Sequence, residues 1–289
     1  MRIGVVFPQT ELGGDAGAVR AYAQGAGELG YSHVLIYDHV VGADPAAYPD
    51  WNGPYDVHTT FHEPLVVYGY LAALTSMELV TGILILPQRQ TVLAAKQAAE
   101  VDLLTNGHFR LGVGVGWNQV EYEALGQDFH ARGRRLDEQI PLLRRLWTEQ
   151  SVTFHGTFDH ITGAGLAPLP VQRPIPVWIG AQSPVAYRRV GRLADGWFPQ
   201  LPPGAELDEA RRIVAGAARE AGRDPGSIGM EGRVNWRGDP GQLAGRLRQW
   251  QDAGATHVSV NTMGAGLRTV DDHLGALATS FAAAKDVAS

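Results

Sequence analysis

A carboxylate and an imidazole stand side by side in Tyr37-Asp38-His39, at the end of a short apolar run. Histidine titrates near neutral pH, so His39 can act as a proton donor, as a base or as a hydrogen-bond partner to a heterocycle. Asp38 can then fix a backbone group or a bound cofactor. A loop-capping aspartate beside a partly buried histidine explains the same pair equally well.

A glycine-rich junction follows much later, at Arg110-Leu-Gly-Val-Gly-Val-Gly-Trp-Asn118. It has the pattern of a buried strand that runs into a glycine turn and then a helix, which presents bare backbone N–H groups to an anion such as a phosphate. The glycines do not fit the dinucleotide fingerprint G-x-G-x-x-G, because Trp117 occupies the place of its third glycine. Glycines that only let a strand pack closely are an equally good explanation.

A second turn of this kind lies at Trp178-Ile-Gly-Ala-Gln-Ser-Pro184. Small residues there precede Ser183, a residue type that caps helices, and Pro184 suits the first turn of the helix. The pattern predicts either a second anion site or an ordinary helix cap.

Other kinds of site have weak or missing signatures. His58 and His62 are four residues apart with Glu63 beside them, but the order differs from the zinc-protease motif H-E-x-x-H, and we expect no metal. Neither a G-x-S-x-G nucleophile motif nor a P-loop occurs. Cysteine is absent, which excludes disulfides and thiolate catalysis.

The composition is that of an ordinary globular enzyme, with 45% hydrophobic residues and a net charge of −6. No lysine or arginine tract is long enough to follow a phosphate backbone, so we expect neither nucleic acid nor a membrane as a partner. The first residues contain too short an apolar run for a signal peptide, and no run of about 18 apolar residues occurs. The expected location is the cytoplasm.

Eight short apolar runs alternate with eight longer segments of helical periodicity. The predicted strands are Ile3–Pro8, Val34–Asp38, Val80–Leu86, Phe109–Val115, Pro176–Gly180, Gly196–Pro199, Ile228–Asn235 and His257–Thr262. The predicted helices are Ala16–Leu29, Glu63–Thr75, Val92–Leu104, Gly133–Thr148, Pro184–Leu193, Leu207–Ala221, Pro240–Ala253 and Val270–Ala284. This α/β alternation predicts a (β/α)8 TIM barrel that forms a single domain over residues 1–289, with its active site where the strands end.

Two segments interrupt the alternation, Val41–His62 after the second strand and Ser151–Arg173 before the fifth. Both are rich in proline, glycine and aromatic residues and are predicted to be long loops, the first of them a lid over the site. Within the fourth helix, Pro141 predicts a kink or a helix boundary at Ile140.

Taken together, these segments resemble the luciferase-like family of flavin and deazaflavin oxidoreductases, most closely its branch that depends on coenzyme F420. The resemblance runs from Ile3 to about Trp197 and is weaker afterwards. It rests on the order and spacing of Asp38-His39-Val40, Thr81–Arg89, Ala95–Leu104, Arg110–Trp117 with Glu121, Leu125-Gly126, Arg132–Glu138, Pro168–Gln172 and Gly191–Trp197.

The resemblance implies a barrel that holds the flavin-like ring at its mouth, against a non-proline cis peptide bond in the third strand. On the match, that bond joins Ile83 to Leu84, with Leu86 nearby. Asp38 and His39 are then contacts of the ring region, and His39 is the candidate catalytic acid or base.

The remaining cofactor contacts are also implied by position. The residues expected along the cofactor tail are Gly114, Val115, Gly116 and Trp117. The residues expected around its phosphate are Gly180, Ala181, Gln182 and Ser183.

The implied activity is hydride transfer between coenzyme F420 and an unidentified small organic substrate, in an enzyme that the family likeness suggests to be a homodimer. An FMN-dependent monooxygenase is an alternative, because a phosphate at the same turn serves both enzymes, and the resemblance also makes a non-catalytic flavin-binding protein possible. In the deazaflavin sugar-phosphate dehydrogenases of this family, a proton-donating carboxylate follows the glycine turn. Trp117 occupies that place, so we do not expect that particular activity.

Overall fold

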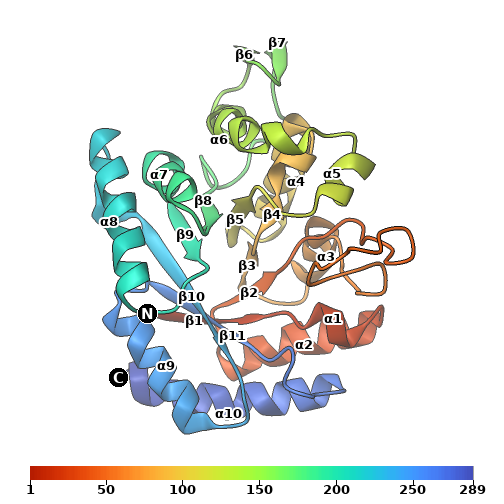
Figure 1. Cartoon of the computed structure of the whole chain (residues 1–289), viewed down its shortest axis with the longest axis vertical. Coiled ribbons are helices and arrows are strands. Elements are labelled where there is room, and N and C mark those ends of the chain that lie inside the picture. The colour runs from red at the N-terminus through yellow and green to blue at the C-terminus, as the bar shows by residue number, and fades with distance from the viewer. Residues whose placement is uncertain (289) are drawn as a thin grey trace.

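The computed structural model describes residues 1–288 and shows a closed barrel of parallel strands inside a ring of helices (Figure 1). The sheet follows the order β3-β2-β1-β11-β10-β9-β8-β5-β4, and pairing of β3 with β5 closes it. The predicted (β/α)8 barrel is therefore confirmed. Its strands are β1 (Arg2–Val6), β2 (His33–Ile36), β3 (Glu78–Thr81), β4 (Leu84–Ile85), β5 (Phe109–Gly114), β8 (Val177–Ala181), β9 (Gly196–Pro199), β10 (Gly229–Asn235) and β11 (His257–Asn261).

The eight predicted helices are all present, and two short ones are added. The helices are α1 (Gln9–Leu12), α2 (Ala16–Leu29), α3 (Pro64–Leu71), α4 (Thr91–Leu104), α5 (Gln119–Ala124), α6 (Arg132–Thr148), α7 (Pro184–Leu193), α8 (Ala205–Glu220), α9 (Pro240–Asp252) and α10 (Val270–Ala288). Short 3₁₀ turns lie at η1 (Leu86–Gln88), η2 (Phe129–Ala131) and η3 (Pro225–Ser227).

Local sequence explains where α2 begins and ends. Asp15 accepts a hydrogen bond from the backbone N–H of Gly17 and so caps the first turn. Gly30 ends the helix with a φ of 99°, in the left-handed region that glycine tolerates. Because both signals are local, the predicted bounds of α2 are correct.

The third predicted strand, Val80–Leu86, is two strands, and its cis bond was predicted one residue too late. The cis peptide bond joins Gly82 to Ile83, not Ile83 to Leu84. A Cβ at position 82 would lie 2.1 Å from the Leu35 side chain, so only glycine fits where the chain turns inward between β3 and β4.

The segment Ser151–Arg173 was predicted to be a long loop, and this is wrong in part. It contains an antiparallel hairpin of β6 (Val152–His155) and β7 (His160–Ala164). Figure 1 shows this hairpin projecting beside α6. The Glu138 carboxylate on α6 accepts hydrogen bonds from three backbone N–H groups of the hairpin turn, those of Thr157, Phe158 and Asp159. A contact with a distant helix therefore stabilises a strand pair that its own sequence signals weakly.

Pro141 does not end its helix. α6 continues through it from Arg132 to Thr148, so the boundary predicted at Ile140 is wrong. Pro141 lies on the exposed side of the helix, whereas Leu136, Ile140 and Leu143 are buried as the periodicity predicts. Burial of that apolar face stabilises the helix against the loss of one hydrogen bond at the proline.

The barrel encloses its own small apolar core. Val6, Leu35, Val80, Trp178 and Phe198 are buried and form a cluster separate from the larger core between the strands and the helices. Along each strand, every second side chain faces inward, and each of these five residues occupies such an inward-facing position. This inner layer is the platform beneath the barrel mouth.

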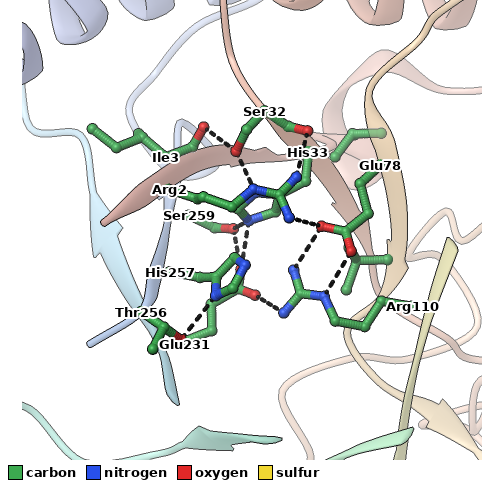
Figure 2. Close-up of polar contacts among 12 residues, drawn as sticks. Arg2, Ile3, Ser32, His33, Glu78, Arg110, Glu231, Thr256, His257 and Ser259 are labelled. Atoms are coloured by element: carbon green, nitrogen blue, oxygen red, sulfur yellow. Dashed lines mark hydrogen bonds and ion pairs between the residues drawn. The ribbon is translucent and has the colours of Figure 1, made fainter. Parts of the chain in front are cut away.

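Below that layer, the end where the strands begin is filled by a charged cluster (Figure 2), here called the charged layer: His33, Glu78, Arg110, Glu231 and Ser259. One oxygen of Glu231 contacts His33 Nε2 at 2.9 Å and accepts from Ser259. Its other oxygen accepts from Arg110 Nη1 at 2.8 Å. The Arg110 guanidinium also lies 4.1 Å from the centre of the Trp178 ring. Ion pairs and packing thus close this end of the barrel.

Tyr68 ties α3 to the barrel and provides a test of the fold. Its buried hydroxyl donates to the carbonyl of Val80 and accepts from the N–H of Ile36 at 3.1 Å. We expect Tyr68→Phe to lower the free energy of unfolding by about 1–3 kcal/mol, because two buried backbone groups lose a partner. Urea unfolding measures this, with Tyr70→Phe on the exposed side of α3 as the control. Equal midpoints for the two variants would show that these bonds contribute nothing.

Candidate active site

A cavity of about 660 Å³ opens at the end of the barrel where the strands finish. It is lined by residues that follow or end six strands, by Arg233 within β10, and by others from a loop, a 3₁₀ turn and two helices. The lining residues are Tyr37, Asp38, His39, Tyr55, Gly82, Ile83, Ile85, Gly114, Val115, Gly116, Trp117, Phe129, Arg132, Gly180, Ala181, Gln182, Ser183, Ala186, Gln200 and Arg233. Segments far apart in the sequence therefore converge at one site.

All the predicted cofactor contacts line this cavity except Leu84 and Leu86. Those two side chains are fully buried in the core between the strands and the helices. Ile85, which lies between them, faces the cavity instead. The alternation of side chains along a strand explains the difference, because the chain turns one residue earlier than the resemblance implied.

Glycines shape the floor of the cavity around Ile83. A Cβ at Gly114 would lie 2.6 Å from Ile83 Cδ1, and a Cβ at Gly180 would lie 3.2 Å from Ile83 Cγ2. Gly116 has a φ of 65°, which side-chain-bearing residues rarely adopt. The missing side chains of the glycine turn therefore leave Ile83 its place beside the open space, which is compatible with close packing and with a bound ring alike.

The turn at Gly180–Ser183 forms a corner suited to an anion. Ser183 accepts from the N–H of Ala186 and caps α7, whose N-terminus opens into the cavity. Arg132 lines the same cavity with its guanidinium 3.7 Å from the centre of the Phe129 ring, and its buried Nε has no hydrogen-bond partner. Sequence patterns did not identify Arg132 as part of this corner, because about 50 residues separate it from Ser183.

The helix after the glycine turn at Gly114–Trp117 contributes less to binding of a phosphate. α5 is only six residues long, and the Asn118 side chain caps it by accepting from the N–H of Glu121. The expected phosphate-binding contribution of this junction is therefore limited to the backbone of Gly114–Trp117.

Asp38 is a structural member of the site. Its two oxygens accept from the N–H of Ile85 at 2.9 Å and from Arg89 at 2.8 Å. Burial raises the pKa of Asp38, and the Arg89 guanidinium and the Ile85 N–H oppose that rise. Of the two roles that the sequence left open, the fixing of a backbone group is the one that these contacts show.

His39 lies at the wall of the cavity beside a buried carboxylate. Its Nδ1 is 3.5 Å from Oε2 of Glu121, whose side chain is fully buried. Burial alone would raise the pKa of Glu121, but contacts from His39, Gln88 and the N–H of Val40 outweigh it and hold that pKa below its usual value. Glu121 is therefore a buried carboxylate with a lowered pKa beside the imidazole, and such a carboxylate can orient a histidine.

Aromatic rings enclose the other sides of His39. The ring centres of Tyr55, Phe61 and Trp117 lie 5.1, 4.7 and 5.6 Å from that of His39. Tyr55 and Phe61 belong to the predicted loop Val41–His62, which contains neither helix nor strand in the described structure. This loop covers part of the mouth, and its role as a lid stays a prediction.

Arg233 approaches the mouth from β10. Its Nη1 donates to the hydroxyl of Tyr37 at 3.0 Å, and both residues line the cavity. No sequence motif marks Arg233. It lies inside a strand, where the side chains of all residues alternate between the two faces.

Three further observations concern metal sites, another cavity and membrane spans. His62 Nε2 lies 3.0 Å from the carbonyl of Gly13 and His58 is exposed, and residues 1–288 contain no group of three or more histidine and acidic side chains arranged for a metal. A second cavity of about 580 Å³ lies beside α8 and contains none of the predicted site residues. No helix in the described structure is both long and apolar enough to cross a membrane.

Comparisons with known proteins identify the family of this chain. Residues 1–234 match the family model described as luciferase-like monooxygenase. An uncharacterized protein of Mycobacterium tuberculosis is 35% identical over 210 residues, 70% of this chain and 71% of that protein. The F420-dependent glucose-6-phosphate dehydrogenase of Intrasporangium calvum is 30% identical over 238 residues, 78% of this chain and 67% of that enzyme.

The fold is also similar to that of solved structures. The monooxygenase RslO1 from Streptomyces bottropensis matches with a TM-score of 0.78 at 19% identity, over 100% of both chains. Since the family model covers most of the sequence and the barrel is shared, this chain is an enzyme that belongs to the luciferase-like monooxygenase family.

Proposed function

We propose that this enzyme transfers a hydride between coenzyme F420, a deazaflavin, and a small organic substrate. The observation that carries the proposal is the convergence of Ile83, two glycine turns and Arg132 on one cavity. The 30% identity to an F420-dependent enzyme supports the choice of cofactor.

The residues present fit such a cofactor. The missing side chains of Gly114 and Gly180 leave room for the side chain of Ile83, which lines the cavity beside the space where a flat ring would lie. Gly114–Trp117 would hold the cofactor tail. The corner of Ser183 and Arg132 would hold its phosphate, since Arg132 has a buried Nε without a partner and a helix N-terminus lies beside it.

When bound, the deazaflavin supplies hydride transfer at the central carbon of its ring. The chain supplies orientation, exclusion of water and proton transfer. The proposed site of proton transfer is the imidazole of His39, which Glu121 orients and three aromatic rings shield. Asp38 and Arg89 keep the floor of the site in place.

An FMN-dependent monooxygenase is the second candidate, because the same turns would serve the phosphate of FMN. The likeness to the monooxygenase RslO1 and the name of the family favour it. Membership in an enzyme family argues against the third possibility, a non-catalytic flavin-binding protein.

Titration of the purified protein with F420 and with FMN, followed by the fluorescence of each cofactor, tests the proposal. We expect tight binding of F420 and weaker binding of FMN. Tight binding of FMN without measurable affinity for F420 would overturn the proposal in favour of the monooxygenase.

Substitution of Gly114 tests whether the glycine floor holds the cofactor. We expect Gly114→Ala to weaken F420 binding about tenfold or more, because the new methyl group would displace Ile83 into the space of the ring; tenfold corresponds to about 1.4 kcal/mol. Gly216→Ala is the control, since a Cβ there meets no atom within 4 Å. Unchanged affinity in a folded Gly114→Ala protein would show that the turn is only structural.

A further inference from the structure

Arg233 is a cation at the mouth with no acidic partner. It follows Glu231 by two residues on β10 and so faces the interior of the barrel, as Glu231 does. Glu231 is fully engaged below it, with one oxygen on His33 and Ser259 and the other on Arg110. In the described part of the chain no carboxylate forms an ion pair with Arg233, whose side chain is exposed in the open cavity.

The other carboxylates at the mouth are also committed. Asp38 binds Arg89 and the N–H of Ile85. Glu121 is bound by Gln88 and by the N–H of Val40. Neither is left to neutralise Arg233, so the cavity carries a positive charge on its β10 side.

This positive charge lies apart from the corner suited to the cofactor's phosphate. That corner is built from the ends of β5 and β8, the N-terminus of α7 and Arg132. Arg233 stands on β10, separated from β8 by β9 in the closed sheet. A single cofactor phosphate would therefore not account for both cations.

Hydrogen-bond donors at Arg233 are free for a ligand. A guanidinium has five N–H donors in a planar fork that matches a carboxylate or a phosphate, and the structure uses one of them on Tyr37. The Tyr37 hydroxyl accepts that bond, which leaves its own hydrogen to donate. Burial raises the pKa of Tyr37, and Arg233 opposes that rise. The two side chains thus present a small set of donors to the open cavity.

We propose that the substrate carries a carboxylate or a phosphate, and that Arg233 and Tyr37 bind this group on the β10 side of the mouth. The inference rests on the proposed function, because it assigns the β5 and β8 side to the F420 phosphate. It narrows the substrate to a small organic anion and makes Arg233 a determinant of specificity.

The test is isothermal titration of the F420-loaded protein with inorganic phosphate, with 4-oxopentanoate and with 2-pentanone, which lacks the carboxylate of the second probe. We expect the wild type to bind the two anions and to bind 2-pentanone more weakly. Arg233→Gln is expected to weaken binding of both anions about 10- to 100-fold, since charged hydrogen bonds are lost. Arg233→Lys should restore part of the affinity. Arg237→Gln, an exposed arginine beyond the same strand, is the control.

F420 affinity, measured for every variant, separates this inference from the proposed function. Unchanged anion binding in Arg233→Gln, or no anion binding by the loaded wild type, would overturn the inference. Loss of F420 affinity in Arg233→Gln would also overturn it, because Arg233 would then belong to the cofactor site. If the wild type binds no F420, the proposed function fails. Phosphate titration of the cofactor-free Arg132→Gln protein, with and without Arg233→Gln, then still tests the anion site.

Discussion

Replacement of Glu231 by alanine is expected to lower the free energy of unfolding by about 3–5 kcal/mol, because it breaks a buried ion pair from one side. Arg110 would keep its charge in the barrel interior, with only its longer contacts to Glu78 at 3.4 Å. His33 and Ser259 would lose the oxygen that both of them contact. The affected layer closes the barrel, so its loss acts on the whole fold.

Urea unfolding followed by circular dichroism measures this effect. Glu149→Ala removes an ion pair of α6 that is exposed to solvent, and it should change the midpoint far less. The double variant Glu231→Leu with Arg110→Met should regain much of the lost stability, because apolar residues of similar size can replace a buried pair. A Glu231→Ala protein as stable as the wild type would show that the charged layer does not stabilise the barrel.

The charged layer, together with His257, whose ring centre lies 5.6 Å from that of His33 (Figure 2), makes the stability depend on pH. The pKa of Glu231 lies well below its usual value of 4.5, because His33 and Arg110 outweigh the effect of burial. Its contribution is complete above about pH 4.5 and is lost as the pH falls through the lower folded pKa. Burial and the charge of Arg110 lower the pKa of His257 from 6.5 to about 3. The contribution of its neutral form to stability is therefore present above pH 6.5 and is lost as the pH falls from 6.5 to about 3.

Both groups act in the same direction, His257 below pH 6.5 and Glu231 below about pH 4.5, and the protein should therefore unfold more easily as the pH falls from 7 to 3. Melting temperatures at pH 7, 5 and 3 measure this trend. The Glu231→Leu and Arg110→Met double variant should show a flatter dependence, since Glu231 no longer titrates and the Arg110 charge beside His257 is gone. A wild-type melting temperature independent of pH would contradict the assignment.

The barrel could be predicted from the sequence because each unit carries its own signal. The run Gly82-Ile-Leu-Ile-Leu86 and the periodic face of Leu136, Ile140 and Leu143 are visible without any knowledge of neighbours. The break between β3 and β4 was placed one residue late, because it depends on the contact of Gly82 with Leu35, which lies on another strand. The hairpin of β6 and β7 depends in the same way on Glu138.

The candidate site could likewise be predicted only where its residues form short motifs. The Asp38-His39 pair and the two glycine turns are short motifs, and the structure brings them to one cavity. Arg132 and Arg233 could not be found, because their roles follow from the register of strands and helices that are far apart in the chain. The charged layer is equally hidden, since 121 residues separate Arg110 from Glu231. Strands buried on both faces also show no polar alternation that would mark an inward position.

Replacement of His39 by alanine is expected to lower kcat about 10²- to 10⁴-fold, the usual contribution of a positioned acid or base, while F420 affinity changes little. The expectation follows from the geometry, because the imidazole lines the cavity but takes no part in the glycine floor or the anion corner. The measurement is oxidation of reduced F420 with the best substrate of the wild type among anionic carbonyl compounds. His58→Ala, at an exposed histidine of the loop Val41–His62, is the control and should leave kcat unchanged.

Glu121→Gln then separates orientation from proton transfer. It keeps the size of the side chain that contacts His39 Nδ1 but removes the charge, so we expect a smaller loss of kcat than in His39→Ala and an unchanged KM. Since a positioning residue acts only through its partner, the double variant should be no slower than His39→Ala alone. If instead His39→Ala weakens F420 binding and leaves kcat intact, the histidine is a cofactor contact, and the proton must come from another group at the mouth. Tyr37 would then be the next to test, because its hydroxyl lines the same cavity and is held by Arg233.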